Sequence, residues 1–288
     1  MLRIQNLSKT YPNGVKALQD VTLEIPRGMF GLLGENGAGK STLMRTIATL
    51  QAPDTGSIML DDLDVLKQKE DVRKVLGYLP QEFGVYPRIS ALAMLDHFAL
   101  LKGITNKSER NRVVEGLLQQ TNLWKERKRR LDSYSGGMKQ RFGIAQALLG
   151  DPRLIIVDEP TAGLDPEERN RFHNLLAEIG ENVVVLLSTH IVEDVRDLCS
   201  QMAIISKGEV LLSGRPEEII RGIDGKIWER EIEKTELEAY EREHNVISTR
   251  LYGGRTLIHV HAEAAPPGFA PVTPDLKDVY FSALKRVA

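Results

Sequence analysis

Residues 34–41 read Gly34-Glu35-Asn36-Gly37-Ala38-Gly39-Lys40-Ser41, and this stretch decides the fold. It fits the pattern G-x-x-x-x-G-K-[ST], in which a glycine-rich loop aims its backbone N–H groups at phosphate oxygens. The apolar run Met29–Leu33 before it is typical of a buried strand, and Lys40–Leu50 after it has the apolar spacing of a helix. A strand, a phosphate loop and a helix in this order predict a nucleotide-binding α/β fold.

Two side chains at the end of the loop indicate its chemistry. Lys40 is expected to neutralise the β- and γ-phosphates of a nucleotide, and the Ser41 hydroxyl to bind Mg²⁺. The helix that follows adds the positive end of its dipole. A glycine turn with an exposed lysine is the alternative, but the position between a strand and a helix argues against it.

A second apolar strand, Leu154–Val157, ends in the carboxylates Asp158 and Glu159. At a strand end, Asp158 can hold Mg²⁺ through water, and Glu159 can orient or deprotonate an attacking water molecule. A strand followed by an acidic turn is common by itself, so the interpretation of this pair depends on the phosphate loop.

A third element, Ser133–Gln140, leads into a helix that runs through Leu149. Ser135 and the backbone amides of Gly136 and Gly137 stand at the N-terminus of this helix, where they can bind an anion. A simple helix cap is the alternative for this segment.

The remaining core residues read as alternating strands and helices. An apolar strand is expected at Val183–Ser188, with helices at Pro166–Ile179 and Val192–Leu198. Such alternation predicts a largely parallel sheet that is covered on both faces.

The chain divides by composition. Residues 84–150 look mainly helical and predict a helical lobe, and the composition shifts after Arg221. We therefore expect one large domain of residues 1–221 and a small α+β appendage of residues 222–288.

Two features of the expected appendage carry their own predictions. Thr273-Pro274 is predicted to be the N-cap and first residue of a last helix through Lys285. His259 and His261 alternate with apolar residues on an expected strand, which favours a solvent-exposed face over a metal-binding pair.

Together these motifs resemble the ABC ATPase family. The loop at 34–41, Tyr134-Ser135-Gly136-Gly137-Met138, the Asp158-Glu159 pair and Ala162-Gly163-Leu164-Asp165 occur in the family's order, and Gln81 and His190 complete the set. The resemblance covers roughly residues 1–215 and implies a P-loop NTPase of the ABC type, with a mixed sheet core and a helical lobe. Two positions depart from the commonest signature, because Tyr134 replaces leucine and Met138 replaces glutamine.

The resemblance also implies a role for each site residue. Tyr11 is expected to stack on adenine (a half-buried strand-end tyrosine is the alternative), and His190 to hydrogen-bond the γ-phosphate. The implied catalytic residues are Glu159, His190 and Gln81, and the implied Mg²⁺ contacts are Ser41, Gln81 and Asp158. The implied ATP contacts are Tyr11, Gly34, Asn36, Gly37, Gly39, Lys40, Ser41, Thr42, Ser135, Gly136, Gly137 and Asp165, the last at the seam of a dimer.

The resemblance implies two partners. The chain has one phosphate loop and one signature segment, and in this family the signature serine faces the nucleotide of another copy, so a homodimer with composite ATP sites is expected. The tail Pro274–Tyr280 resembles the closing stretch of bacterial drug-resistance and antibiotic-efflux ATPases, which pair with a separate membrane permease. Phe83, Val85 and Tyr86 are candidates for docking that permease. An ATPase subunit of an exporter is the expected function, and a soluble ABC ATPase that remodels another protein assembly is the alternative.

Composition narrows the partners and the location. The formal net charge of −2 implies no general attraction to nucleic acid, and the single cysteine, Cys199, excludes an internal disulfide and fits a reducing compartment. The start of the sequence lacks the apolar stretch of a signal peptide, and the longest apolar runs fall far short of the ~20 residues of a membrane helix. We expect a prokaryotic cytoplasmic protein, held on the cytoplasmic face of the cell membrane by its permease.

Overall fold

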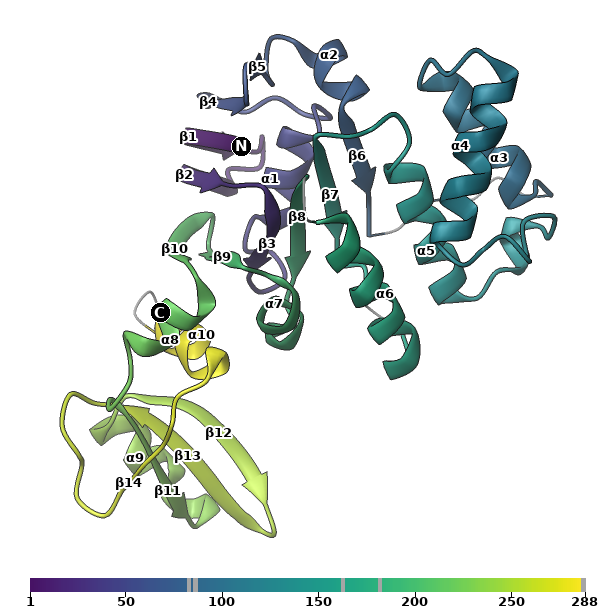
Figure 1. Cartoon of the computed structure of the whole chain (residues 1–288). Coiled ribbons are helices and arrows are strands. Elements are labelled where there is room, and N and C mark those ends of the chain that lie inside the picture. The colour runs from purple at the N-terminus through teal and green to yellow at the C-terminus, as the bar shows by residue number, and fades with distance from the viewer. Residues whose placement is uncertain (82–83, 85–87, 162–163, 181–182, 286–288) are drawn as a thin grey trace.

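In a computed structural model of the chain, the core is a six-stranded sheet with the order β10-β9-β3-β8-β7-β6 (Figure 1). The structure describes residues 1–288 except 82–83, 85–87, 162–163, 181–182 and 286–288. The strands are β3 (Gly28–Leu33), β6 (Leu76–Leu79), β7 (Leu154–Asp158), β8 (Val184–Thr189), β9 (Gln201–Ser206) and β10 (Glu209–Gly214). Neighbours are parallel except for the edge strand β10, which turns back on β9. This is the largely parallel sheet that the sequence predicts.

A smaller antiparallel sheet faces one side of the central sheet. Its order is β2-β1-β4-β5, and its strands are β1 (Leu2–Thr10), β2 (Lys16–Ile25), β4 (Thr55–Leu60) and β5 (Leu63–Asp64). Helix α1 (Lys40–Ile47) lies between the two sheets, because Leu43, Met44 and Ile47 share one buried cluster with residues of both. The short helix α2 (Lys69–Lys74) leads into β6.

Helices cover the other side of the central sheet. They are α6 (Pro166–Ile179), α7 (Val192–Leu198) and α10 (Leu276–Lys285). Phe172, Val195 and Val279, one from each helix, belong to a buried cluster with residues of the central strands. Cys199, just after α7, is buried in this cluster beside Gly31 of β3. Strands that are apolar on both faces fit a sheet covered from both sides.

A helical lobe stands at the β6 edge of the sheet (Figure 1). It contains α3 (Ala91–Leu101), α4 (Lys107–Gln120) and α5 (Gly136–Ala147). Leu95, Val114 and Phe142, one from each helix, lie in an apolar cluster of their own. Helix α5 also packs against β6 and α6, and so joins the lobe to the central sheet.

The C-terminal part forms a third sheet, with the order β12-β13-β11-β14. Helix α8 (Pro216–Arg221) leads into it, and its elements are β11 (Ile227–Ile232), α9 (Leu237–Glu243), β12 (Val246–Tyr252), β13 (Arg255–His261) and β14 (Ala270–Pro271). Ile232, Val246, Ile258 and Val260 form a small apolar cluster within it. The chain then returns to the core, where α10 packs against α7, α8 and β12. None of the helices in the described ranges has the length and apolar composition needed to cross a membrane.

The last helix starts later than the sequence predicts. It begins at Leu276, and the Asp275 side chain caps it by accepting hydrogen bonds from the N–H groups of Lys277 at 2.8 Å and Asp278 at 3.0 Å. The prediction of Thr273 as N-cap and Pro274 as first helical residue is wrong. Aspartate is the stronger N-cap, and Asp275 stands directly after Pro274.

The prediction that His259 lies on a solvent-exposed face is wrong, because its side chain is turned toward α10. Its Nδ1 lies 2.8 Å from Asp278 Oδ1 on α10, and its Nε2 lies 3.8 Å from Glu229 Oε2 on β11. Helix α10 thus covers this face of β13, which the alternating pattern of the strand alone could not indicate. Within the described residues, no group of three or more His, Cys, Asp or Glu side chains could hold a metal ion.

Candidate active site

The motifs predicted from the sequence meet at one edge of the central sheet. Strands β3, β8 and β7 are parallel neighbours, with Leu33 opposite Thr189 and Asp158 opposite Ser188. Their carboxyl ends therefore open at the same edge, which is where ligands bind in open α/β sheets. The phosphate loop follows β3, the two carboxylates stand at the end of β7, and His190 follows β8.

The phosphate loop closes around the Lys40 side chain. The Lys40 ammonium donates hydrogen bonds to the carbonyl oxygens of Gly34 at 2.7 Å and Glu35 at 3.1 Å, and Lys40 is only 5% exposed. The positive charge is thereby fixed at the end of β3, inside the loop that is predicted to hold phosphate.

The backbone of the loop requires glycine where it enters helix α1. Gly39 has a φ of +108°, and a side chain there would overlap with the carbonyl oxygen of Ala17. Asn36 and Gly37 lie at the exposed tip of the loop, while Ser41 and Thr42 lie in the first turn of the helix. The predicted loop residues therefore surround one helix N-terminus, as an anion site requires.

Glu159 joins three of the predicted motifs. Its Oε1 lies 3.4 Å from Lys40 Nζ, and its Oε2 lies 2.6 Å from His190 Nδ1. The backbone of Glu159 is left-handed, with a φ of +48°, and its N–H donates to the carbonyl oxygen of Ser188 at 3.0 Å. A left-handed glutamate costs about 1–3 kcal/mol and persists only when the surroundings fix it. The carboxylate is thus held, 7% exposed, between the phosphate loop and the histidine.

Asp158 is buried at the end of β7 and is oriented by a neighbour that sequence analysis does not single out. Ser188 on β8 donates a hydrogen bond to Asp158 Oδ1 at 2.8 Å. Helix α1, which carries Ser41 in its first turn, contacts β7. A carboxylate and a hydroxyl oxygen are the ligand types that Mg²⁺ prefers, and it commonly completes its shell with water and phosphate oxygens. The residues present therefore fit Mg²⁺.

Tyr11 lies beside the first turn of α1. Its hydroxyl is 3.2 Å from Thr42 Oγ1 and donates to Gln51 Oε1 at 3.3 Å. Gln51 stands outside every motif, so the sequence does not indicate that it belongs to the site. The half-buried Tyr11 ring is therefore next to the phosphate loop, where a base attached to bound phosphates can reach it.

Gln81 lies two residues past β6, the strand next to β7, and its side chain is exposed. It therefore belongs to the same edge of the sheet as Asp158. The permease-docking candidates Phe83, Val85 and Tyr86 lie outside the described residues, as do Ala162 and Gly163.

The signature segment caps helix α5 and contacts α6. Ser135 is the N-cap of α5, and its Oγ accepts a hydrogen bond from the N–H of Met138 at 3.2 Å. At Gly137 a side chain would overlap with the Glu168 carboxylate, which forms a close ion pair with Arg141 of α5. Figure 1 shows α5 in the helical lobe, apart from the loop between β3 and α1, so the chain does not bring its own signature to its own phosphate loop.

Asp165, the last of the predicted ATP contacts, caps the neighbouring helix. Its Oδ1 accepts a hydrogen bond from the N–H of Glu168 at 2.8 Å at the start of α6. Because Glu168 also pairs with Arg141, the segment around Asp165 and the signature helix are joined by a short chain of contacts.

The two departures from the common signature face the lobe interior. Tyr134 is buried, and its hydroxyl donates to the carbonyl oxygen of Glu126 at 2.9 Å. Burial raises the pKa of Tyr134 to about 12, so the hydroxyl remains a donor at neutral pH. Met138 packs against the same apolar cluster. The substitutions therefore alter packing in the lobe and leave Ser135 and Gly137 in place.

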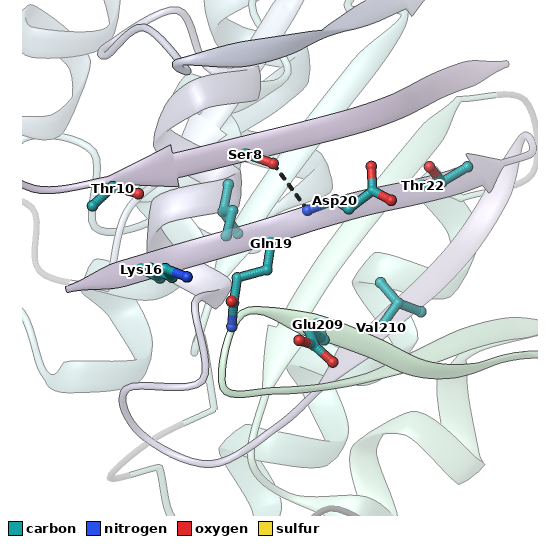
Figure 2. A pocket seen from close by; sticks show the side chains of 9 residues that line it. Ser8, Thr10, Lys16, Gln19, Asp20, Thr22, Glu209 and Val210 are labelled. Atoms are coloured by element: carbon teal, nitrogen blue, oxygen red, sulfur yellow. Dashed lines mark hydrogen bonds between the residues drawn. The ribbon is translucent and has the colours of Figure 1, made fainter. Parts of the chain in front are cut away.

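A hollow of about 710 Å³ lies elsewhere, on β1, β2 and β10 (Figure 2). Ser8, Lys16, Asp20 and Glu209 are among its lining residues, and the Ser8 hydroxyl accepts a hydrogen bond from the N–H of Asp20 at 3.0 Å. None of the predicted site residues lines it. The lining of this hollow carries charges of both signs and favours no single class of ligand. A large hollow is therefore not by itself evidence for the functional site of this protein.

Comparison with known proteins identifies the family. The family model described as ABC transporter matches residues 18–162, just over half of the chain, including the phosphate loop, the signature and the Asp158-Glu159 pair. The chain belongs to the ABC transporter ATP-binding family.

Individual ABC proteins resemble the chain over most of its length. The ABC transporter ATP-binding protein NatA of Bacillus subtilis (strain 168) is 39% identical over 71% of this chain and 84% of NatA. The linearmycin resistance ATP-binding protein LnrL of the same strain is 33% identical over 78% of this chain and 72% of LnrL. The methionine import ATP-binding protein MetN 1 of Bacillus thuringiensis subsp. konkukian (strain 97-27) is 35% identical over 75% of this chain and 66% of MetN 1.

A solved ABC structure matches the fold. The dimeric post-hydrolysis state of the ATP-binding cassette MJ0796, bound to ADP and Pi, has a TM-score of 0.68 and 28% identity, and the match covers 75% of this chain and 98% of that one. Like the ABC cassettes that it resembles, the chain is an ATP-hydrolysing subunit of an ABC transporter.

Proposed function

We propose that this ABC cassette is the ATPase of an exporter, and that it powers a separately encoded membrane permease by closing and opening as a homodimer. The observation that carries the catalytic part is the buried Glu159 carboxylate, held between Lys40 and His190. A carboxylate beside the phosphate-loop lysine and an imidazole is well placed to orient water for attack on a γ-phosphate.

The site residues divide the work of hydrolysis. Glu159 orients the attacking water and accepts its proton, while His190 hydrogen-bonds the γ-phosphate and holds Glu159. Lys40 balances the phosphate charge and Tyr11 stacks on adenine. The phosphates are bound by the loop residues Gly34, Asn36, Gly37, Gly39, Ser41 and Thr42. Ser41, Asp158 and Gln81 would hold Mg²⁺, which would neutralise charge on the phosphate oxygens.

A second copy completes each site. Because α5 lies apart from the phosphate loop of its own chain, the segment Ser135-Gly136-Gly137 is free to bind a nucleotide held by another copy. Asp165 lies beside that segment through Glu168 and Arg141. ATP that touches both copies only in the closed pair favours closure, and hydrolysis removes this contact.

The chain works at the cytoplasmic face of a prokaryotic cell membrane and does not bind nucleic acid. Residues 1–221, with a helical lobe at 84–150, form the ATPase domain, and residues 222–288 form an appendage.

Export is the favoured direction of transport. The similarity to LnrL, named for linearmycin resistance, supports export. Import is the second candidate, because MetN 1 is named for methionine import.

Replacing the carboxylate tests the catalytic proposal. Glu159→Gln keeps the size of the side chain but removes the base, so we expect the ATPase rate to fall about 10²–10³-fold while ATP still binds. Steady-state phosphate release and equilibrium binding of ATP are measured on the same preparation. Glu167→Gln, an exposed carboxylate on α6, is the control and should keep its activity. Wild-type turnover in Glu159→Gln would remove that residue from the mechanism.

The partner is tested by affinity capture of tagged Glu159→Gln from detergent-solubilised membranes of the native host in the presence of ATP. Recovery of a multi-span membrane protein, identified by mass spectrometry, supports the transporter assignment. Recovery of soluble partners alone favours the ABC ATPase that remodels another assembly.

Direction is tested by deleting the gene in its host. Greater sensitivity to a panel of membrane-active antibiotics, restored by the wild-type gene and not by Glu159→Gln, supports export. Unchanged sensitivity together with poor growth on limiting methionine favours import.

A further inference from the structure

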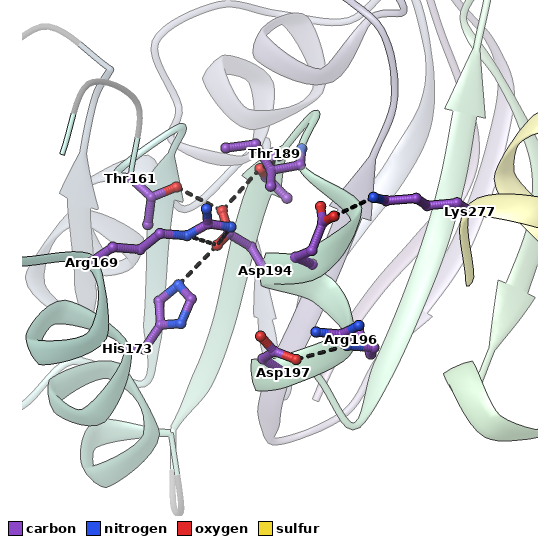
Figure 3. A network of polar contacts seen from close by, with 10 residues as sticks. Thr161, Arg169, His173, Thr189, Asp194, Arg196, Asp197 and Lys277 are labelled. Atoms are coloured by element: carbon purple, nitrogen blue, oxygen red, sulfur yellow. Dashed lines mark hydrogen bonds and ion pairs between the residues drawn. The ribbon is translucent and has the colours of Figure 1, made fainter. Parts of the chain in front are cut away.

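A buried carboxylate behind the site joins its two catalytic loops. Asp194 on α7 is 0% exposed, and four side chains surround it (Figure 3). Its Oδ1 accepts hydrogen bonds from Arg169 Nε at 2.9 Å and His173 Nε2 at 2.8 Å, both on α6. Its Oδ2 accepts from the hydroxyls of Thr161 at 2.6 Å and Thr189 at 3.4 Å.

The two threonines stand next to residues of the proposed site. Thr189 directly precedes His190, and its Oγ also accepts a hydrogen bond from the N–H of Ile191 at 2.9 Å, so it fixes the backbone on both sides of the histidine. Thr161 lies two positions after Glu159, in the loop that follows β7. One carboxylate therefore holds the start of both loops.

The groups around Asp194 keep its carboxyl group in the ionised form. Burial by itself raises the pKa of this carboxyl, but the hydrogen bonds from His173, Thr161 and Arg169 outweigh it, and the pKa lies below the ordinary value. A buried carboxylate is expensive to desolvate, and an apolar side chain would pack against α6 without that cost. The four donors thus orient an ionised group that the packing of α7 does not require.

We propose that Asp194 is a positioning residue for ATP hydrolysis, which aligns His190 with Glu159. The carboxylate acts through Thr189 and Thr161 and does not touch the nucleotide. A path of contacts continues from Arg169 along α6 to Glu168, and from there to Arg141 on the signature helix. This inference rests on the roles proposed above for Glu159 and His190.

The variant Asp194→Asn tests the proposal, because it keeps the shape of the side chain and removes its charge. Misplacement of catalytic groups without loss of the phosphate loop should lower kcat about 10–100-fold and leave the KM for ATP within about twofold. Glu193→Gln is the matched control on the same helix: its carboxylate pairs with Lys277 of α10, away from the loops, and activity should be unchanged.

A double variant separates positioning from general weakening of the fold. In a His190→Ala background, adding Asp194→Asn should lower the single-turnover rate by a smaller factor than it does in the wild type, because one of the two residues that Asp194 aligns is gone. Two losses that simply multiply would overturn the proposal, as would a kcat of Asp194→Asn equal to that of the wild type. Asp194→Glu, which restores the charge, should recover part of the rate.

Thr161→Val keeps the proposal testable if Asp194→Asn does not fold, since it removes only one donor from the carboxylate. We expect Thr161→Val to lower kcat about fivefold in the wild-type background, and by a smaller factor in the His190→Ala background. An unchanged rate for Thr161→Val would then overturn the proposal for Asp194.

Wild-type turnover in both Glu159→Gln and His190→Ala would instead contradict the proposed site itself. Lost turnover in those two, with a normal Asp194→Asn, would fault only the role of Asp194.

Discussion

At the scale of single residues, the signature tyrosine shows how a departure from a family pattern can be absorbed locally. The Tyr134 side chain points into the lobe, and its hydroxyl donates a hydrogen bond to the carbonyl oxygen of Glu126. A leucine at this position could not supply this hydrogen bond. The neighbouring Ser135 still caps α5. The substitution should therefore matter for the stability of the lobe and little for hydrolysis.

Tyr134→Phe tests this separation. It removes one buried hydrogen bond, so the free energy of unfolding should fall by about 1 kcal/mol while the ATPase rate stays within about twofold of the wild type. Urea denaturation and phosphate release measure the two effects. Tyr240→Phe is the control, because the Tyr240 hydroxyl makes no hydrogen bond within the described residues, and it should be nearly neutral. A large loss of activity in Tyr134→Phe would mean that the ring also orders the signature segment.

The residues of the candidate site could be predicted where a motif fixes their spacing. Lys40 and Ser41 lie within one loop, and Asp158 and Glu159 are adjacent, so the sequence alone places each pair. It does not indicate that Ser188 orients Asp158 or that Arg141 pairs with Glu168, because these partners are 30 and 27 positions apart. Such contacts depend on strand register and helix packing, which no local pattern encodes.

At the scale of elements, the last helix depends on one cap. The Asp275 carboxylate accepts hydrogen bonds from two N–H groups that would otherwise have no partner in the helix. Helix α10 in turn packs against α7 and β12, so the cap supports the contact between the C-terminal sheet and the core.

Asp275→Ala should therefore loosen α10 by about 1 kcal/mol, and its amides should exchange with solvent faster. Hydrogen exchange measured by mass spectrometry resolves this helix from the rest of the chain. Thr273→Ala removes the residue that sequence reasoning selects as the cap, and it should leave exchange unchanged. The reverse result, with Thr273 important and Asp275 neutral, would contradict the structure.

Elements with a clear apolar period are the part of the fold that the sequence predicts best. Helices α6 and α7 have the predicted bounds, Pro166–Ile179 and Val192–Leu198. No strand or helix is predicted from the sequence between Gln51 and Pro80, where β4, β5, α2 and β6 lie. Strand β6 has only four residues, and β4 begins with Thr55-Gly56-Ser57, so neither shows a clear apolar period.

At the scale of the whole molecule, one ion pair links the C-terminal sheet to α10. The hydrogen bond from Asp278 raises the pKa of His259, and the charges of Asp278, Glu229 and Asp275 add to this effect against the opposing effect of burial. Protonated His259 thus stabilises the contact. Since the folded pKa is raised, this stabilisation is fully present below about pH 6.5, the ordinary pKa of histidine, and is lost as the pH rises through the folded pKa.

This pair should therefore contribute less to the stability of the wild type at pH 8.5 than at pH 6. His259→Gln should be less stable than the wild type at pH 6, and the gap between the two proteins should narrow as the pH rises. Chemical denaturation at both pH values gives the comparison. A gap that stays constant or widens with pH would show that the protonated form of His259 does not provide the stabilisation.

The burial of Cys199 has a practical consequence for following the two copies. It is the only cysteine of the chain, it is buried against β3 directly after α7, and burial raises the pKa of its thiol. Thiol reagents attack the thiolate form of accessible cysteines, so the native protein should remain unlabelled. A cysteine introduced at an exposed position such as Leu50 would then be the single site that a maleimide dye or spin label reaches. Its own cysteine should therefore not need to be removed before spectroscopic distances between copies are measured.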